Sequence, residues 1–433
     1  MKVLNGGASR AAADSAPTAS RSTVGAQPNE LASRFVGRKY VQLVIVLGAL
    51  SAIGPMTIDT YLPALPQLSA ELGATDAQAQ ATITGLLVGL GFGQLILGPL
   101  SDAVGRRRPL LIGLAVHAGT SLLCALAPSV TMLAVTRTLQ GFAGAAIAVV
   151  SMAIVRDLFR GIRAAQLLSR LMLVLGLAPL LAPSLGSALL ALTSWRGIFV
   201  AIAVVAALMM IPAFIALPET LPVERRRSAG IRGTVSAYGS LFADRLFIVM
   251  VVVAALVFAT LFAYIAGASF VLQDLYGLTT AQFGIAFSVN TIGMIVMTQL
   301  NPWLVKRYSP VNVLTFGVLL ATAGAVSLLV LMLLGVGGWF AFLAPLFFVL
   351  SGAGLSFPNA PAIALNRHGE SAGTAAAMLG AAQFMVGGSV APLVGLLDNG
   401  TPMPMSAIMV GTTGLAAILL LSTRKRLLLD DYR

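Results

Sequence analysis

Asp59 is the residue of this 433-residue sequence whose type and position most clearly allow chemistry. It lies about five residues from the end of the apolar segment 40–63, or roughly 8 Å inside a bilayer at the rise of a helix. A carboxylate at that depth is energetically expensive, so a functional role is the default interpretation. Since a carboxyl group can take up and release a proton, Asp59 is a candidate for coupling proton movement to other work.

Arg137 is the second candidate, because no other base lies so far inside an apolar segment. It lies about seven residues inside the segment 130–154, roughly 10 Å deep by the same rise, which is similar to the depth of Asp59. An unpaired arginine is unstable there, and a carboxylate partner is the common remedy. The sequence therefore predicts that Asp59 and Arg137 act together in proton coupling. A static ion pair, or an Asp59 that merely reaches the outer interface, is the open alternative.

The composition indicates that lipid is the solvent for most of the surface. Hydrophobic residues make up 58% and charged residues 10% of the chain, and the mean hydropathy is +0.93. A soluble domain carries charges at about a quarter of its positions. The net charge of +12 is spread over alternate short loops rather than gathered on one face, which argues against nucleic acid as a partner.

The sequence offers little material for a metal centre, a nucleotide site or an enzyme. His117 and His368 are too few for a metal site, and the single cysteine, Cys124, lies within an apolar segment. No glycine-rich loop is followed by Gly-Lys-Ser/Thr, so ATP is not an expected ligand. We expect no cofactor, and a protein that draws its energy from gradients.

Twelve apolar segments follow residue 40, each long enough to cross about 30 Å of hydrocarbon. The predicted spans are 40–63, 79–101, 109–126, 130–154, 165–190, 196–217, 246–270, 281–302, 311–335, 338–358, 372–397 and 404–423. The expected fold class is an all-α membrane protein of twelve transmembrane helices. Residues 1–35 lack the apolar run of a secretory signal and are expected to be a disordered cytoplasmic tail.

The loop charges predict the orientation. Basic residues precede the first span and follow the even-numbered ones. They are Arg34, Arg38 and Lys39, then Arg106, Arg107 and Arg108, then Arg156, Arg160, Arg163 and Arg170, then Arg225, Arg226, Arg227, Arg232 and Arg245, then Lys306 and Arg307, then Arg367, and finally Arg424, Lys425 and Arg426. The opposite loops carry Glu71, Asp76, Asp274 and Asp398, with Arg196 as their base. A multi-pass protein of the inner (plasma) membrane with both termini in the cytoplasm is therefore expected.

The two halves of the chain repeat one another. The basic turn at Arg106 recurs at Lys306, and the Gly-rich fifth span recurs as the eleventh. Such duplication builds transporters whose site lies between two pseudo-symmetric halves. The predicted domains are a tail at 1–35, a six-helix bundle at 36–218, a cytoplasmic connection at 219–245, a second six-helix bundle at 246–424 and a cytoplasmic tail at 425–433.

Residues 98–108, GPLSDAVGRRR, resemble the signature loop of the major facilitator superfamily, in which Gly, Leu, Asp, Gly, Arg and a further base stand at fixed spacing. Further stretches are similar to the bicyclomycin/chloramphenicol-resistance branch of twelve-helix drug:proton antiporters. They are 58–66, 137–141, 195–199 and 217–220. This resemblance spans about residues 40–424, and both Asp59 and Arg137 match positions that related antiporters use for coupling.

The resemblance also implies a cytoplasmic gate that latches the two halves when the outer side is open. Its residues would be Gly98, Asp102, Gly105, Arg106 and Arg107, with Asp157 in the same charge cluster. Asp102 would face the start of the eleventh span near 371–374, where backbone N–H groups favour an anion. A loop that only sets the topology is the simpler alternative.

The fifth span is similar to the antiporter motif of exporters in a diverged form. Its residues are Gly176, Pro179, Pro183 and Gly186, and the two prolines permit bending. The spans that line the cavity in relatives carry possible substrate-binding residues. These are Tyr61, Gln140, Tyr264, Gln273, Asn290 and Phe384. An apolar cavity with so few polar groups suits lipophilic small molecules, neutral or cationic.

The function we expect is proton-coupled efflux of small drug-like or antibiotic molecules by alternating access, and the resemblance implies a monomer. Transport of a specific metabolite, by uptake or exchange on the same fold, is the alternative that uptake assays would separate. A sensor would bind a ligand without flux. A membrane enzyme would need a cluster of catalytic groups, for which one Asp and one Arg are poor material.

Overall fold

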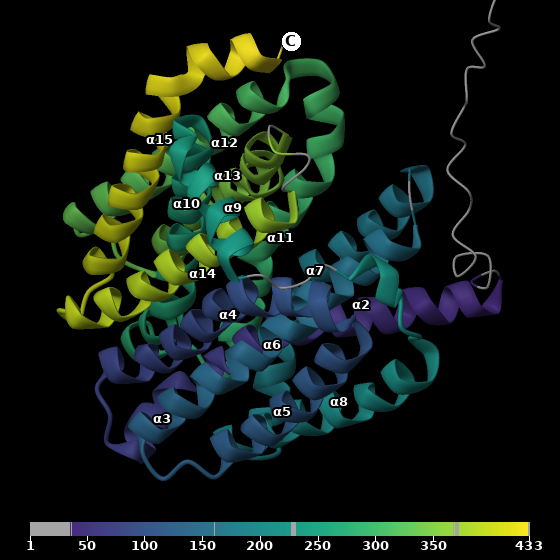
Figure 1. Cartoon of the computed structure of the whole chain (residues 1–433). Helices are drawn as coiled ribbons and strands as arrows, with labels where there is room; N and C mark the ends of the chain where they lie inside the picture. Colours follow the sequence, from purple (N-terminus) through teal and green to yellow (C-terminus); the bar gives the residue numbers. More distant parts are fainter. Residues whose placement is uncertain are drawn as a thin grey trace, which may run out of the picture.

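The computed structural model describes residues 35, 37–159, 161–226, 231–366, 368 and 372–431. The predicted tail at 1–35 lies outside the described residues apart from Phe35, and so does Arg367. Throughout the described ranges the chain is nearly all helical and contains no strand (Figure 1).

The helices fall into two groups of similar make-up. Those of the first half are α2 (Arg38–Asp59), the 3-10 turn η1 (Leu62–Ala64), α3 (Leu65–Leu72), α4 (Asp76–Val104), α5 (Arg107–Ala125), α6 (Val130–Leu158), α7 (Gly161–Leu190) and α8 (Trp195–Ala216). Those of the second half are α10 (Arg245–Phe270) with its π-helical extension η3 (Val271–Leu275), α11 (Thr280–Tyr308), α12 (Pro310–Leu333), α13 (Trp339–Asn366), α14 (Ala372–Leu396) and α15 (Met403–Asp431).

Membrane-crossing length and apolarity confirm the predicted fold class. Within the described residues, eleven helical segments are long and apolar enough to cross a membrane, and a shorter apolar segment, Leu177–Leu190 of α7, supplies the twelfth. The ranges that the sequence predicts as spans each fall on one of these segments. The chain is therefore an all-α, multi-pass membrane protein.

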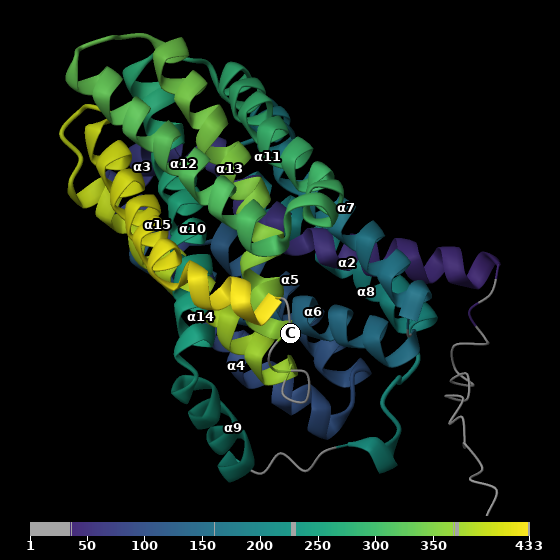
Figure 2. The same ribbon diagram turned by 90° about the horizontal axis from the view of Figure 1, so that it is seen from above.

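The two halves form two bundles that lie against one another (Figures 1 and 2). Helix α4 packs on α14 of the other half, and α7 packs on α11. Inside the first bundle α4 and α6 approach closely because of two glycines: a Cβ at Gly89 would collide with the carbonyl of Thr138, and one at Gly141 with the carbonyl of Leu86. Small residues permit such close contact between membrane helices.

The helices differ from the predicted boundaries in three places. The first predicted span is interrupted, since α2 ends at Asp59 and the chain continues through η1 into α3. Pro63 and Pro66 stand at the starts of η1 and α3. A proline has no N–H group, so it is tolerated in the first turn of a helix but interrupts a helix that would continue through it. The predicted connection at 219–245 contains η2 (Val223–Arg225) and α9 (Ile231–Ala243), and α15 runs on to Asp431.

We name the two ends of the molecule by the charges that they carry. The basic end holds the α4–α5 turn with Arg106 and Arg107, together with Arg156 at the end of α6. The acidic end is defined by four carboxylates in the connections at the opposite ends of the helices. They are Glu71, Asp76, Asp274 and Asp398.

Candidate functional site

A cavity of about 600 Å³ extends from the basic end into the space between the two bundles. Its walls come mainly from α4 and α6 of the first half and α14 of the second. Apolar and small side chains dominate, while Gln94 and Gln383 offer amides and Asp102, Arg106 and Arg156 bring charges from the helix ends. The cavity is large enough for a drug-sized molecule.

The acidic end is closed by hydrogen bonds that cross between the two halves. Ser269 donates to the carbonyl of Leu62 over 2.8 Å, and Gln273 donates to the carbonyl of Pro63 over 3.3 Å. Thr84 of α4 donates to the Gly388 carbonyl of α14 over 2.6 Å. The molecule is therefore open at its basic end and closed at its acidic end.

Asp59 ends α2 at the junction of the two bundles. Its side chain is 3% exposed, and its Oδ1 atom has no hydrogen-bond partner among the described residues. Tyr264 of α10 interacts electrostatically with this carboxyl and has Asn290 of α11 as a side-chain neighbour. The ring of Tyr264 is stacked on Phe287 at 5.0 Å between centroids. The carboxyl predicted to carry a proton thus faces the other half of the molecule.

Arg137 is fully buried and acts on the backbone of α2. Its Nη1 atom donates to the carbonyl of Thr57 over 3.0 Å and to Oε1 of Gln140 over 2.9 Å. The guanidinium carbon lies 4.7 Å from the ring centroid of Tyr61 and 5.5 Å from that of Phe199. The arginine therefore has carbonyl, amide and aromatic partners.

The structure does not form the ion pair between Asp59 and Arg137 that depth alone suggests. Among the described residues no salt bridge joins them. The reason is geometric: Arg137 contacts the carbonyl of Thr57 and the ring of Tyr61, which follows the end of α2, while Asp59 is about 200° around the helix from Thr57. Residue counting gives Asp59 and Arg137 a similar depth, but Asp59 lies on the side of α2 away from Arg137, which belongs to α6.

His117 joins the group around Arg137, although the sequence analysis assigns it no role there. It is 1% exposed, with Nδ1 at 3.2 Å from the carbonyl of Gln140 and Nε2 at 3.2 Å from Oγ1 of Thr57. Since a carbonyl only accepts, Nδ1 carries a proton. Gln140 also donates to Ser121 over 2.7 Å. The available signal was the spacing of His117, Ser121 and Cys124, which places all three on one face of α5.

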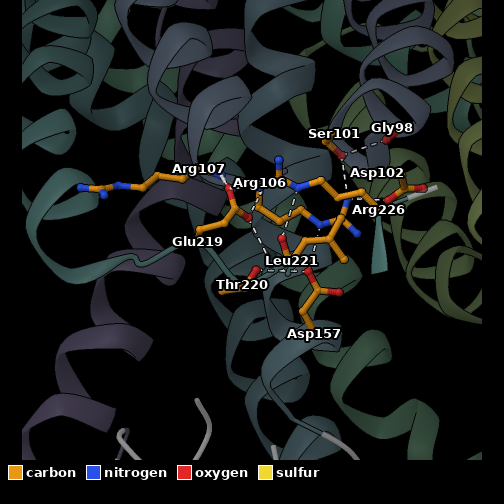
Figure 3. Close-up of polar contacts among 10 residues, drawn as sticks. All are labelled: Gly98, Ser101, Asp102, Arg106, Arg107, Asp157, Glu219, Thr220, Leu221 and Arg226. Atoms are coloured by element: carbon orange, nitrogen blue, oxygen red, sulfur yellow. Dashed lines mark hydrogen bonds and ion pairs between the residues drawn. The ribbon is translucent and has the colours of Figure 1, made fainter. Parts of the chain in front are cut away.

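At the basic end the signature loop forms a compact charge cluster (Figure 3). Arg106 binds Asp102 at 2.5 Å and Asp157 at 2.9 Å, and it donates to Ser101 over 2.8 Å. Burial alone would lower the pKa of the Arg106 guanidinium, but the hydrogen bond and charge of Asp157, together with Asp102, raise it above the ordinary value. Asp102 lines the same cavity as Gly373 and Thr374 of α14.

Glu219 completes this cluster. Its carboxylate accepts from the backbone N–H of Arg106 over 2.8 Å and of Arg107 over 3.3 Å, at the start of α5 (Figure 3), where a helix dipole favours an anion. Arg226 lies 3.9 Å from it, and Thr220 donates to Asp157 over 3.1 Å. The sequence signal was present, because Glu219 follows the sixth span directly beside a basic loop.

Gly105 has the backbone that this arrangement needs. Its φ angle of +99° lies in the region that favours glycine. A Cβ there would also collide with the Glu219 carboxylate.

The predicted substrate-binding residues fall into four places. Phe384 lines the cavity. Tyr264 interacts electrostatically with Asp59 and has Asn290 as a neighbour, and Gln273 belongs to the closed acidic end. Tyr61 and Gln140 lie inside the first bundle against Arg137. In this state, then, one of the six contacts the cavity.

The predicted antiporter-motif helix is α7, which contains Pro179 and Pro183 and begins well before Gly176. A Cβ at Gly186 would collide with the carbonyl of Thr60, so α7 rests directly on the end of α2. Next to it, Ser187 donates to the carbonyl of Thr280 over 2.9 Å and Ser184 lies 3.2 Å from Ser288. Helix α7 therefore connects the neighbourhood of Asp59 with α11 of the other half.

Two bundles, a cavity open at one end and buried polar groups at their junction define a membrane transporter. Comparison with protein families agrees: residues 46–392 match the Major Facilitator Superfamily. The chain belongs to this superfamily.

Relatives and solved structures support the same assignment. The chain is 35% identical to an uncharacterized MFS-type transporter, YdgK, of Bacillus subtilis over 88% of this chain and 95% of that one. It is 32% identical to a bicyclomycin resistance protein homolog of Haemophilus influenzae over 84% and 91%, and 26% identical to multidrug resistance protein D of Escherichia coli over 84% and 90%. A D-xylose-proton symporter shares the fold with a TM-score of 0.72 at 16% identity, covering 88% and 97%.

Proposed function

We propose that this transporter exports small drug-like molecules across the inner membrane in exchange for protons, by alternating access. The observation that carries the proposal is Asp59, a buried carboxyl without a partner for Oδ1 that faces Tyr264 of the opposite bundle. The relatives named for bicyclomycin and multidrug resistance support a drug-like cargo. No cofactor is needed, because the proton gradient supplies the energy.

In this proposal the basic end faces the cytoplasm and both termini lie there, following the charge bias of membrane proteins. The structure then corresponds to the state that is open to the cytoplasm. Lipophilic, neutral or cationic molecules enter the largely apolar cavity between Gln94 of α4 and Gln383 of α14. A monomer is sufficient, since one chain supplies both bundles.

Proton coupling follows from the setting of Asp59. An ionised carboxyl without a partner is unstable in an apolar interior, so we propose that Asp59 holds a proton while the acidic end is closed. Substrate entering from the cytoplasm reorganises the junction and favours release of that proton. When the acidic end opens, water and protons reach Asp59 from outside and displace the substrate.

Arg137 has a positioning role in this scheme. Its hydrogen bond to the carbonyl of Thr57 holds the last turn of α2 and thereby the direction in which Asp59 points.

The proton gradient supplies the energy for transport. One pH unit of gradient supplies about 1.4 kcal/mol per proton, and 100 mV of potential adds about 2.3 kcal/mol per charge moved. One proton per cycle is therefore enough for modest accumulation of substrate.

The experiment compares the natural protein with Asp59→Asn in inverted vesicles, using a panel of antibiotics and fluorescent dyes. With an imposed pH gradient, the natural protein should accumulate substrate inside the vesicles. Asp59→Asn should exchange labelled for unlabelled substrate but build no gradient. Asp274→Asn, which changes an exposed acid at the acidic end, is the control and should behave naturally. Gradient-driven accumulation by Asp59→Asn would refute the role of this carboxyl.

A further inference from the structure

A small cavity lies at the acidic end, in the seam where the two bundles close. Its volume is about 20 Å³, which is room for about one water molecule or one ion. Asp76 and Gln80 line it from the start of α4, and Asp398 lines it from the connection between α14 and α15. The walls thus come from both halves of the molecule.

Gln80 presents an oxygen atom that lacks a partner at this cavity. The residue is 2% exposed, and its Nε2 atom donates to the Ala266 carbonyl of α10 over 3.3 Å. That bond fixes the amide, so Oε1 is directed to the other side, towards Gly395 on α14, three residues before Asp398. No described residue donates a hydrogen bond to Oε1. A buried amide oxygen in this situation favours a partner that donates a hydrogen bond or carries positive charge.

The charges at the cavity point to the same kind of ligand. Asp76 experiences like-charge repulsion from Asp398 and from Asp274. Among the described residues neither Asp76 nor Asp398 has a salt-bridge partner, and the nearby base Arg196 is bound to Glu71. Closing the acidic end therefore brings two carboxylates from opposite halves together without a compensating cation from the protein.

We propose that this cavity binds one hard cation, with Ca²⁺ as the best fit, through Asp76, Asp398 and Oε1 of Gln80. All three donors are oxygens, which hard cations prefer, whereas transition metals favour sites with nitrogen or sulfur ligands. Ca²⁺ accepts six to eight oxygens in flexible geometry and completes its shell with water or backbone carbonyls, whereas Mg²⁺ requires near-ideal octahedral geometry and loses water reluctantly.

The site would exist only while the acidic end is closed, because its ligands come from both bundles. A ligand that binds one of two states shifts the population towards that state. Bound Ca²⁺ would therefore favour the molecule as seen here, open at the basic end. The inference does not depend on the identity of the transported substrate or on proton coupling.

The test measures the width of the acidic end in the purified full-length protein. Spin labels are attached at Leu192→Cys in the first half and Leu334→Cys in the second, which are 86% and 71% exposed. The native Cys124 is buried, so we expect it to stay unlabelled. Titration with Ca²⁺ should shift the distance distribution towards the short, closed distance, with a midpoint of about 0.1–1 mM, as in extracellular calcium modules. KCl at matched ionic strength should not.

Three variants and one control separate cation binding from simple charge screening. Asp76→Asn and Asp398→Asn should both lose the Ca²⁺ response and rest in the closed distance without Ca²⁺, because the repulsion is gone. Gln80→Leu keeps both carboxylates and should require at least tenfold more Ca²⁺. The control, Asp274→Asn, removes a nearby acid that does not line the cavity and should keep the response. An equal effect of KCl, no Ca²⁺ shift, or loss of the response in Asp274→Asn would each overturn the site.

Discussion

At the scale of single residues, Arg137 lies inside the first bundle and Asp59 lies at the junction of the two bundles. Residue counting gives the two a similar depth, yet Arg137 donates to the carbonyl of Thr57, whereas Asp59 interacts with Tyr264 of the other half. Depth follows from counting residues in an apolar run, whereas the direction of a side chain changes by about 100° at each step of a helix. A pairing hypothesis based on depth therefore needs the packing of α2 against α6, and no single-chain pattern supplies it.

The role of Arg137 as a positioning residue predicts how its lysine variant behaves. Arg137→Lys keeps the positive charge but loses the planar group that reaches Thr57, Gln140 and two aromatic rings at once. We expect gradient-driven transport in vesicles to fall nearly as far as in Arg137→Gln. If instead Arg137 were mainly a counter-charge, Arg137→Lys would transport close to the natural rate.

His117 should contribute to stability through its two buried contacts. Replacing it with Phe removes its contacts with Thr57 Oγ1 and the Gln140 carbonyl, which should lower the free energy of unfolding by about 1–3 kcal/mol. Reversible unfolding in mild detergent measures this change. His117→Gln, which can restore one of the two bonds, should recover part of the loss, and equal losses in both variants would contradict the assigned bonds.

On the scale of elements, the turn from α4 to α5 depends on one glycine and one distant carboxylate. Gly105→Ala must adopt a φ angle that favours glycine and must displace Glu219, so we expect a loss of about 1–3 kcal/mol in stability. Gly119→Ala within α5, where an added Cβ meets nothing within 4 Å, is the control and should be neutral or slightly stabilising. Thermal unfolding of both variants provides the comparison.

The helices themselves follow closely from the sequence, because apolar runs of membrane length allow little else. The break after Asp59 and helix α9 do not follow as easily. The first needs the combined effect of Pro63 and Pro66 inside an apolar run. The second is a short helix between the bundles, where a pattern of span-length apolar runs has nothing to detect. Glu219 was visible as a charge next to a basic loop, but its contact with the loop is a tertiary one.

For the whole molecule, an opening at one end only predicts which side admits a reagent. Phe384 lines the cavity that is open at the basic end, and Leu192 is exposed in a connection at the acidic end. With the proposed orientation, a membrane-impermeant thiol reagent should label Phe384→Cys several-fold faster in inverted than in right-side-out vesicles. Leu192→Cys should show the opposite preference. Labelling of both positions from the same side would contradict the proposed topology or the closure of the acidic end.

Gly186 of α7 packs against the carbonyl of Thr60, which directly follows Asp59. Helix α7 is also hydrogen-bonded through Ser187 to α11 of the opposite bundle. Rotation of one bundle against the other would therefore displace the backbone directly beside the carboxyl of Asp59. Protonation and rotation can then influence one another over a single peptide bond, without a long relay of side chains through the bundle.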